Sequence, residues 1–287
     1  MGNSQIPDYR IVQKRRKAFR TFFALLLVFF LLIWIGLPVV MAALWSLVNP
    51  DYPWSYPQLF PSHLSFAQWK YVFEYTEIVR AVITSYTLAP IVTLLTFILA
   101  LPTAYVLGRR EFPGKEAAKI LILLPLLMPG MVTALFLSRV FDFLGLTQNF
   151  IGLVLGHTLG AMPYMLRILT TSFSAIPQDI IDAAENLGAN QYQKYRQVII
   201  PMILPGLFAG TLFSFTSSLE NFGLTFVIGT PTFETIPTIL YAFLGYHFIR
   251  TNAAVVSLIL MIPNIALLFM AERYLKTEYL SAAFGKM

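Results

Sequence analysis

Glu220 is the acidic residue that lies inside one of the long apolar runs of this chain, in the stretch SFTSSLENFG. Burying a carboxylate in a bilayer costs about 2.5–3.5 kcal/mol on insertion scales, so we expect Glu220 to face a bundle interior or a wet cavity. Ser214, Ser217 and Asn221 lie at i, i+3 and i+7 beside it on one predicted helix. This polar stripe could line a path for a solute, or it could pack against a neighbouring helix through hydrogen bonds. We favour the path.

The chain lacks the residue patterns of common catalytic sites. A phosphate-binding loop reads G-x4-G-K-[ST], whereas here the nearest match is Gly114-Lys115-Glu116, and Arg109 stands where the first glycine belongs. No G-x-S-x-G element is present. The three histidines are far apart in sequence, so we expect no metal site, and we expect His157 to be held by a hydrogen bond within the bundle. We therefore predict no catalytic residue, no metal and no cofactor on this chain.

A charged segment between two apolar runs, Ile176 to Pro201, is the second feature with functional potential. Pro177 suits the first turn of a helix because its missing N–H is not needed there, and Asp182 lies near the end where the helix dipole favours anions. Gly188 can take the left-handed conformation that ends a helix, and Asn190 can cap a second one. The segment predicts a helix, a glycine corner and a second helix. Chemistry alone leaves open an ordinary amphipathic loop.

Composition identifies an integral membrane protein. Of the 287 residues, 57% are hydrophobic and only 12% are charged, and the mean hydropathy is +0.69. Cysteine is absent, so no disulfide framework or thiolate metal site is possible. The net charge of +6 is better explained by membrane topology than by nucleic acid, which we exclude as a partner.

Six apolar runs are candidates for membrane spans. The first is uncharged, too long for a signal-peptide core and without an A-x-A-like cleavage site, so we expect it to be retained. Asn49–Arg80 is rich in aromatic residues and should lie at the external interface, while Gly229–Arg250 has room for a shallow re-entrant or interfacial helix. The predicted spans are Phe22–Val48, Ala81–Leu107, Lys119–Arg139, Phe150–Arg167, Val198–Val227 and Thr251–Ala271.

The distribution of basic residues tests this topology. Sixteen of the 20 Lys and Arg residues fall in segments that the six-span arrangement places inside the cell. The positive-inside rule expects this asymmetry, with both termini cytoplasmic. We predict a cytoplasmic basic tail, residues 1–20, followed by a single all-α transmembrane domain, residues 21–287.

The segment Ile176–Pro201 resembles the EAA loop of ATP-binding-cassette importer permeases, whose consensus is E-A-A-x3-G-x9-I-x-L-P. The matching residues are Asp182, Ala183, Ala184, Gly188, Val198, Ile200 and Pro201, with Asp for Glu, Val for Ile and Ile for Leu. We call Ile176–Pro201 the coupling loop, because in that family the loop forms a coupling helix that docks into a separate ATPase. The resemblance implies a type I importer permease of six transmembrane helices in a bacterial inner membrane. It also implies ATPase contact through Asp182, Ala183, Ala184, Gly188, Ile200 and Pro201.

The partners implied by this resemblance are a homologous second permease, two ATPase subunits that bind ATP and Mg, an external substrate-binding protein and membrane lipid. Ser214–Tyr241 is in addition similar to the corresponding stretch of spermidine/putrescine importer permeases, which implies a polyamine cargo carried past Ser214, Ser217, Glu220 and Asn221. Asn221 departs from those permeases, which tend to carry a second acid there. Other cargoes, such as 2-aminoethylphosphonate, ferric ion, sulfate or thiamine, stay open. An ion-coupled secondary carrier and a membrane enzyme are the alternatives from other classes.

Overall fold

The computed structural model describes residues 9–284. Residues 1–8 and 285–287 lie outside the described part, as do the side chains of residues 9–16, 18, 270–272 and 274–284. The basic tail predicted for residues 1–20 is therefore described only in part, and residues 9–20 belong to the first helix. Lys286 of the C-terminal tail lies outside the described residues.

The described part is helical and contains no strand; its one β-type pairing is an isolated bridge between Val48 and Leu64. The prediction of an all-α membrane protein is confirmed. The elements are α1 Tyr9–Ser46, α2 Ala67–Tyr75, α3 Ile78–Arg109, α4 Lys115–Leu127, α5 Gly130–Phe143, α6 Phe150–Ser174, α7 Gln178–Asn186, α8 Gln191–Lys194, η1 Tyr195–Ile199, α9 Ile200–Leu219, α10 Phe222–Leu224, η2 Thr225–Gly229, α11 Ile236–Tyr241, η3 Ala242–Tyr246 and α12 Arg250–Phe284, where η marks a π-helical turn.

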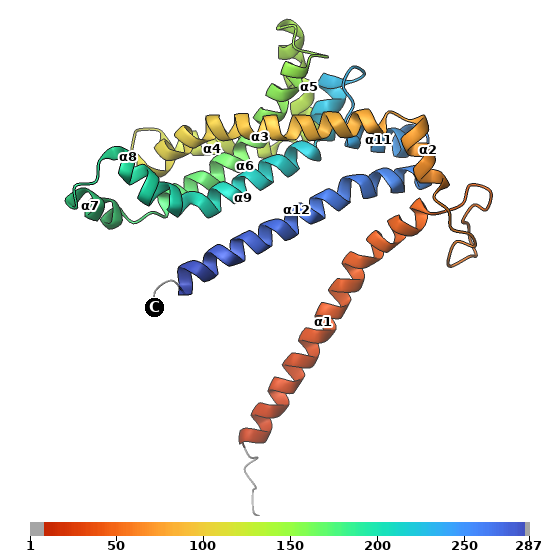
Figure 1. The fold of residues 1–287 in the computed structure, drawn as a ribbon, viewed down its shortest axis with the longest axis horizontal. Helices are drawn as coiled ribbons and strands as arrows, with labels where there is room; N and C mark the ends of the chain where they lie inside the picture. The colour runs from red at the N-terminus through yellow and green to blue at the C-terminus, as the bar shows by residue number, and fades with distance from the viewer. Residues whose placement is uncertain (1–8, 285–287) are drawn as a thin grey trace, which may run out of the picture.

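Helices α3, α6 and α9 lie side by side as the centre of the bundle (Figure 1). Glycines let α9 approach α6 closely: a Cβ on Gly206 would lie 1.8 Å from Ser172 Oγ, and one on Gly210 would lie 2.6 Å from Met165 Sδ. Helices in lipid gain little from apolar burial and rely instead on such close packing between small residues. Gly206 and Gly210 thus allow the close α6–α9 contact that connects Ile176–Pro201 to the rest of the bundle.

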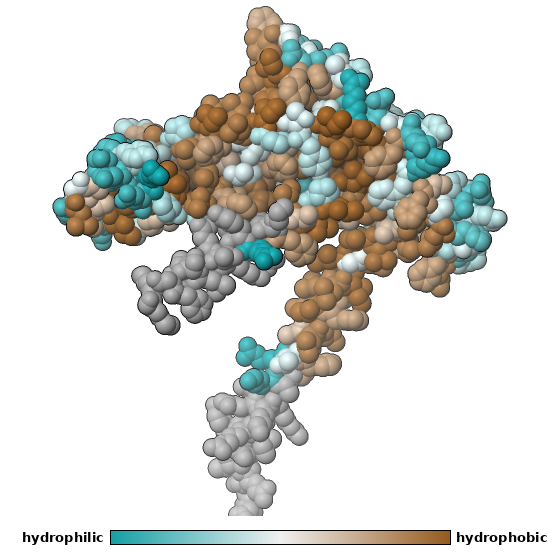
Figure 2. All heavy atoms as spheres, in the orientation of Figure 1, coloured by the Kyte–Doolittle hydropathy of each residue, from teal (hydrophilic) through white to brown (hydrophobic). Residues whose placement is uncertain are grey.

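The apolar surface matches a membrane-embedded body. Hydrophobic atoms cover much of the molecule, and hydrophilic atoms gather at the end near α7 and on the opposite side, from beside α5 to α2 (Figure 2). By length and composition four described helices could cross a membrane: α1, α3, the continuous Gln191–Leu219, and α12; α4 and α5 would make five if counted as one span. Helix α6, the predicted fourth span, has 25 residues but is not among them. The count of six spans stays a prediction.

The third predicted span, Lys119–Arg139, is not one continuous helix. It is divided into α4 and α5, which meet at an angle of 105°. Met128 precedes Pro129 and is extended, with φ −92° and ψ 138°, and Pro129 likewise has ψ 132°. Proline disfavours the helical conformation of the residue before it and offers no N–H to the preceding turn. The sequence Met128-Pro129-Gly130 therefore ends one helix and starts another.

The fifth predicted span ends earlier than Val227. Helix α9 stops at Leu219, and Asn221 leaves the helical region with φ −75° and ψ 97°. The prediction that Asn221 continues a stripe on the same helix is wrong. The Asn221 side chain accepts a hydrogen bond from the Leu224 N–H at 3.0 Å and so caps a new helix, which is the usual competition of asparagine with helix continuation.

The segment Gly229–Arg250 holds the short apolar helix Ile236–Tyr246, made of α11 and η3. It is too short to cross a bilayer, as expected for an interfacial or re-entrant piece. Helix α1 diverges from the bundle, which it meets through α12 (Figure 1), and none of its most apolar stretch is buried. A helix that is apolar on all sides in this way suits a lipid environment.

Candidate functional site

The coupling loop folds as the helix, glycine corner and helix that its sequence predicts. Pro177 stands at the N-cap position of α7 without making a side-chain cap bond, so it precedes the first turn instead of occupying it. After the corner, α8 and the π-helical turn η1 lead without a break into α9. The turn is widened because the Ile200 N–H bonds to the Tyr195 carbonyl, five residues earlier. The next residue, Pro201, has no N–H to offer the Gln197 carbonyl.

Gly188 makes the corner possible. Its φ is +81°, in the left-handed region that side chains with a Cβ rarely adopt. The Gly188 N–H donates to the Glu185 carbonyl at 2.9 Å, and the Ala189 N–H donates to the Ala184 carbonyl at 3.0 Å. These are the paired bonds of a Schellman C-cap, which satisfies carbonyls left open at the end of α7. The corner is therefore a defined structure.

Asn190 starts α8 through a reciprocal cap. Its side chain accepts a bond from the Gln193 N–H at 2.9 Å, and its own N–H donates to Gln193 Oε1 at 2.8 Å. Lys194 ends α8 and is buried, and its ammonium group bonds to the Glu185 carboxylate of α7. This ion pair joins the two helices of the coupling loop.

Apolar side chains anchor both ends of the coupling loop in the bundle. Ile176, before α7, and Ile199, at the end of η1, are each about 5% exposed. They belong to one buried cluster with Leu169 and Phe173 of α6 and with Ala104 of α3. Both ends of the coupling loop are therefore packed against the same buried cluster of the bundle.

Arg109 provides a polar anchor that the sequence did not reveal. At the end of α3, its Nη1 donates to the Ile176 carbonyl at 2.8 Å and its Nη2 donates to Gln178 Oε1. Gln178 Nε2 in turn donates to Asp182 Oδ1 at 2.8 Å. Nothing in the local sequence of Arg109 points to a partner 67 residues away.

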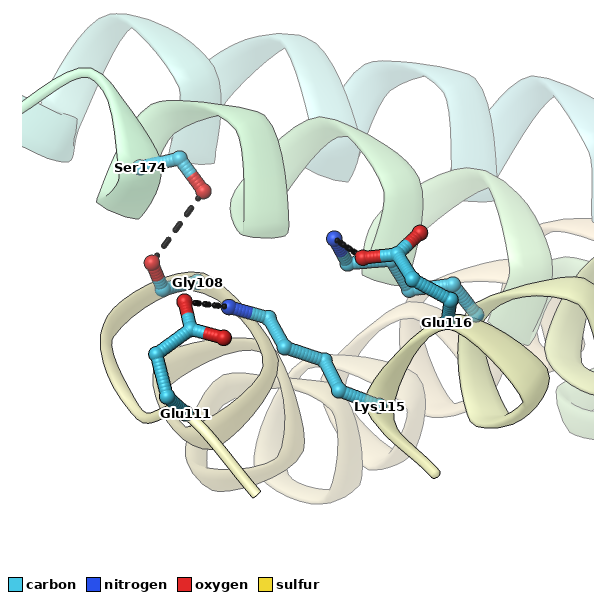
Figure 3. A network of polar contacts seen from close by, with 6 residues as sticks. Gly108, Glu111, Lys115, Glu116 and Ser174 are labelled. Atoms are coloured by element: carbon cyan, nitrogen blue, oxygen red, sulfur yellow. Dashed lines mark hydrogen bonds and ion pairs between the residues drawn. The ribbon is translucent and has the colours of Figure 1, made fainter. Parts of the chain in front are cut away.

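The adjoining end of α3 is held by a second set of polar contacts (Figure 3). Ser174 Oγ of α6 donates to the Gly108 carbonyl at 3.2 Å, and Lys115 bonds to Glu111 at 2.8 Å. The hydrogen bond from Lys115, and then its charge, lower the pKa of the fully exposed Glu111 carboxyl. Lys119 pairs with Glu116 at 2.7 Å on the first turns of α4.

The outer face of α7 is open and mixed in character. Asp182 and Ala183 are exposed, whereas Ala184 is half-buried. Leu187, just before the corner, is 88% exposed, and Ile180 is 42% exposed. Leu187 was missed from sequence, because a single apolar residue beside a glycine corner carries no signal of its own. Ile200 and Pro201 begin α9, and both are exposed.

The predicted polar stripe is only partly aligned. Ser214 is fully buried, and its hydroxyl has no hydrogen-bond partner among the described residues. Ser217 is half-buried. Glu220 is exposed as the C-cap of α9 and accepts a bond from Asn264 Nδ2 of α12 at 3.3 Å, while Asn221 caps α10. The turn at Glu220 and Asn221 thus separates these two residues from the serines.

His157 is held inside the bundle, as predicted. Its Nδ1 lies 3.1 Å from Ser218 Oγ, and its Nε2 lies 3.0 Å from Thr225 Oγ1. Both partners were missed from sequence, although Ser218 lies one turn after Ser214. The two contacts tie α6 to α9 and to η2. Within the described residues, no group of three or more His, Cys, Asp or Glu residues could hold a metal ion.

An aromatic cluster follows Glu220. Phe222 packs against Phe226 and Tyr241, with ring centroids 5.0 and 4.6 Å apart, and Tyr241 meets Tyr246 edge-on at 5.5 Å. Tyr241 and Tyr246 are 40% and 63% exposed. The chain therefore carries an exposed carboxylate, Glu220, two residues before Phe222, whose ring packs in a cluster with the partly open ring of Tyr241. Carboxylates and aromatic faces both attract cations.

Residues 100–277 match the family of binding-protein-dependent transport system inner membrane components. The chain belongs to this family. It is thus a permease subunit of an ATP-binding-cassette importer, a multi-pass membrane protein whose matched region contains the coupling loop and the whole Ser214–Asn221 segment.

Individual relatives of the permease share less than 30% sequence identity with it over the aligned regions. It is 28% identical to the spermidine/putrescine transport system permease protein PotC of Haemophilus influenzae, over 60% of this chain and 66% of that protein. It is 27% identical to the sulfate transport system permease protein CysT of Salmonella typhimurium, over 72% of this chain and 80% of that protein. The match to PotC therefore spans slightly less than two thirds of that relative.

Among solved structures, the permease resembles a chain of a bacterial ABC transporter involved in the import of the acidic polysaccharide alginate. The TM-score is 0.71 at 19% identity, and the alignment covers 94% of this chain and 99% of that chain. At this identity the likeness shows the fold alone. The permease has the importer permease fold, and its cargo must be argued from its own residues.

Proposed function

We propose that this permease carries a small organic cation of the polyamine class into the cell. It works beside a homologous second permease, two separate ATPase subunits that bind ATP and Mg, and an external binding protein that delivers the cargo. The observation that carries the cargo class is the exposed Glu220 carboxylate two residues before Phe222, the first residue of the aromatic cluster Phe222, Phe226, Tyr241 and Tyr246.

The coupling loop is the ATPase-docking element of this proposal. Its outer face offers Ala183 for close approach, Leu187 as an exposed apolar side chain and Asp182 as a charge. Its inner side is anchored by Ile176 and Arg109, so a partner that moves α7 must also move α3 and α6. Force transfer between two proteins requires an exposed contact surface that is firmly attached to the rest of its own protein, and α7 meets both conditions.

Glu220 suits a transported cation because a single carboxylate attracts the cation but does not bind it too tightly for release. Its described partner is the neutral amide of Asn264, so its charge is not cancelled by a bonded cation. Two unit charges 4 Å apart attract by about 1 kcal/mol in water and about 4 kcal/mol at an effective dielectric constant of 20. Open aromatic faces add about 0.5–1 kcal/mol for each cation contact at exposed sites. Such energies favour passage and still permit release.

The relatives' names include both polyamine and sulfate permeases, so the cargo must be tested directly. We would purify the permease with its partners from its native membrane, reconstitute the complex in vesicles and measure uptake of radiolabelled putrescine. Glu220→Gln keeps the size and hydrogen-bonding capacity of the side chain and removes its charge. We expect uptake to fall about tenfold or more, which corresponds to ~1.4 kcal/mol.

Glu74→Gln is the matched control, because Glu74 is a half-exposed acid on α2 and is not part of the polar stripe or of the cluster Phe222, Phe226, Tyr241 and Tyr246. This variant should transport normally, and the external protein should bind putrescine equally well in all samples. Uptake unchanged by Glu220→Gln would contradict the cationic cargo. Uptake that persists without ATP would instead identify an ion-coupled carrier and contradict the assignment of the coupling loop.

A further inference from the structure

A groove of about 260 Å³ lies between α4 and α6, with the end of α3 as its floor. One face of each outer helix contributes, because the lining residues of each helix recur at spacings of three and four. The lining residues are Leu107 of α3, Lys119, Ile122 and Leu123 of α4, and Leu166, Arg167, Thr170, Thr171 and Ser174 of α6. None of the candidate residues for ATPase coupling or for the substrate path lines it.

The groove has an apolar wall and a cationic opening. Leu107 and Leu166 are each 5% exposed and form its buried side. Arg167 is exposed, and Lys119 has a side chain that is 35% exposed. A ligand that fits must therefore combine a negative group with an adjoining apolar part.

The charge in the groove is not balanced. Lys119 is paired with Glu116, whose carboxylate points to solvent with 78% of its side chain exposed. No carboxylate lies within salt-bridge distance of Arg167 among the described residues. One net positive charge is left, which matches a ligand with a single negative charge.

Two of the three hydroxyls that line the groove already donate within the chain. Thr171 Oγ1 donates to the Arg167 carbonyl at 3.0 Å, and Ser174 Oγ donates to the Gly108 carbonyl at 3.2 Å. Their hydrogens are thus used within the chain. An anion in the groove would be recognised by the Arg167 guanidinium, which binds phosphate oxygens in a bidentate way, and by the Lys119 ammonium.

The position of the groove is that of a lipid headgroup. It lies at the first turns of α4 and the last turns of α6, between the apolar body and the hydrophilic end formed by the coupling loop (Figures 1 and 2). Basic pockets between transmembrane helices at such a boundary bind anionic phospholipid headgroups. We propose that this groove holds the phosphodiester of an anionic phospholipid such as phosphatidylglycerol, with the start of its acyl chains on the apolar wall. This site does not depend on the proposed cargo.

The test is native mass spectrometry of the intact importer complex, released from detergent that contains phosphatidylglycerol or phosphatidylcholine. Wild type should retain phosphatidylglycerol in preference to phosphatidylcholine. Arg167→Ala and Lys119→Ala should each weaken phosphatidylglycerol retention about fivefold, the factor expected from one basic residue near an anionic surface. The two residues lie on different helices, so the second variant serves if the first fails to assemble.

Arg110→Ala is the matched control, because Arg110 is an exposed cation near the same end of α3 but does not line the groove. This variant should retain as much phosphatidylglycerol as wild type. Equal retention by wild type, Arg167→Ala and Lys119→Ala would overturn the proposal, as would an equal loss in Arg110→Ala. Displacement of the lipid by millimolar inorganic phosphate would overturn it too, because the site would then bind a soluble anion.

Discussion

Removing the Arg109 side chain should loosen the coupling loop from the bundle while leaving the bundle folded. Arg109 Nη1 bonds to the Ile176 carbonyl at 2.8 Å, and Nη2 bonds to Gln178. A hydrogen bond that involves a charged group contributes about 1.5–3 kcal/mol net. The first bond is part-buried and the second is exposed, so we take ~2 kcal/mol for Arg109→Ala. The equilibrium for local opening of residues 176–187 should then rise about 30-fold.

Amide hydrogen exchange of the purified complex measures this directly. Peptides from residues 176–187 should exchange about 30-fold faster in Arg109→Ala, while peptides from α9 should change little. Arg109→Lys keeps the charge but cannot form the same forked pair of bonds, so it should give an intermediate rate. Arg110→Ala, an exposed neighbour, should exchange like wild type.

Function should follow the same order. If the coupling loop transmits force through Arg109, Arg109→Ala should keep the basal ATP hydrolysis of the complex and lose most of the stimulation by the loaded external protein. Unchanged exchange of residues 176–187 in a folded Arg109→Ala complex would refute the anchoring argument. Faster exchange with normal stimulation would refute only the role of Arg109 in coupling.

Other predictions follow from the same structure. Gly188→Val, at φ +81°, and Ala183→Asp, on the open face of α7, should reach the membrane yet lose stimulated ATP hydrolysis; normal stimulation in both would contradict the docking assignment. Single cysteines at the exposed positions 60 and 144 should react with an impermeant thiol reagent in intact cells, and those at 112 and 187 should not; labelling at 187 would overturn the topology. Burial, and then the charge of Glu77, raise the pKa of Glu234 in the folded protein above its ordinary value of 4.5. Above the raised pKa the ionised Glu234 destabilises the folded state, and this destabilisation is lost below pH 4.5. Glu234→Gln should therefore raise the unfolding temperature at pH 7 and lose this advantage as the pH falls to 4; an equal difference at both pH values would contradict this cause.

The sequence alone determined the class of protein and the local form of the coupling loop. Apolar runs long enough to span a bilayer need no tertiary context, because every backbone group in lipid must be paired within its own helix. The corner at Gly188 and the cap at Asn190 were also predictable, since each depends on one residue and its immediate neighbours. The EAA-like motif indicated the family for the same reason, because all of its residues lie in one short stretch of sequence.

Breaks within apolar runs were harder to place. Pro129 and Asn221 were visible in the sequence, but prolines also occur inside the intact helices α3 and α12. At the two breaks the backbone conformation differs from that of an intact helix. Met128 and Pro129 are both extended, and the Asn221 side chain caps a new helix at the Leu224 N–H. Hydropathy cannot detect either event. The prolines suggested kinked helices without showing that Pro129 would divide a span, and the early end of α9 was not predicted.

Only the tertiary structure decided which residues act together. Arg109 meets Ile176, His157 meets Ser218 and Thr225, and Arg167 shares a groove with Lys119 across two helices. These partners are separated by dozens of residues, and their encounter depends on how closely α3, α6 and α9 pack at small residues such as Gly206 and Gly210. The types of residue were written in the chain, but contact between them is a property of helix packing, which periodicity and composition do not encode.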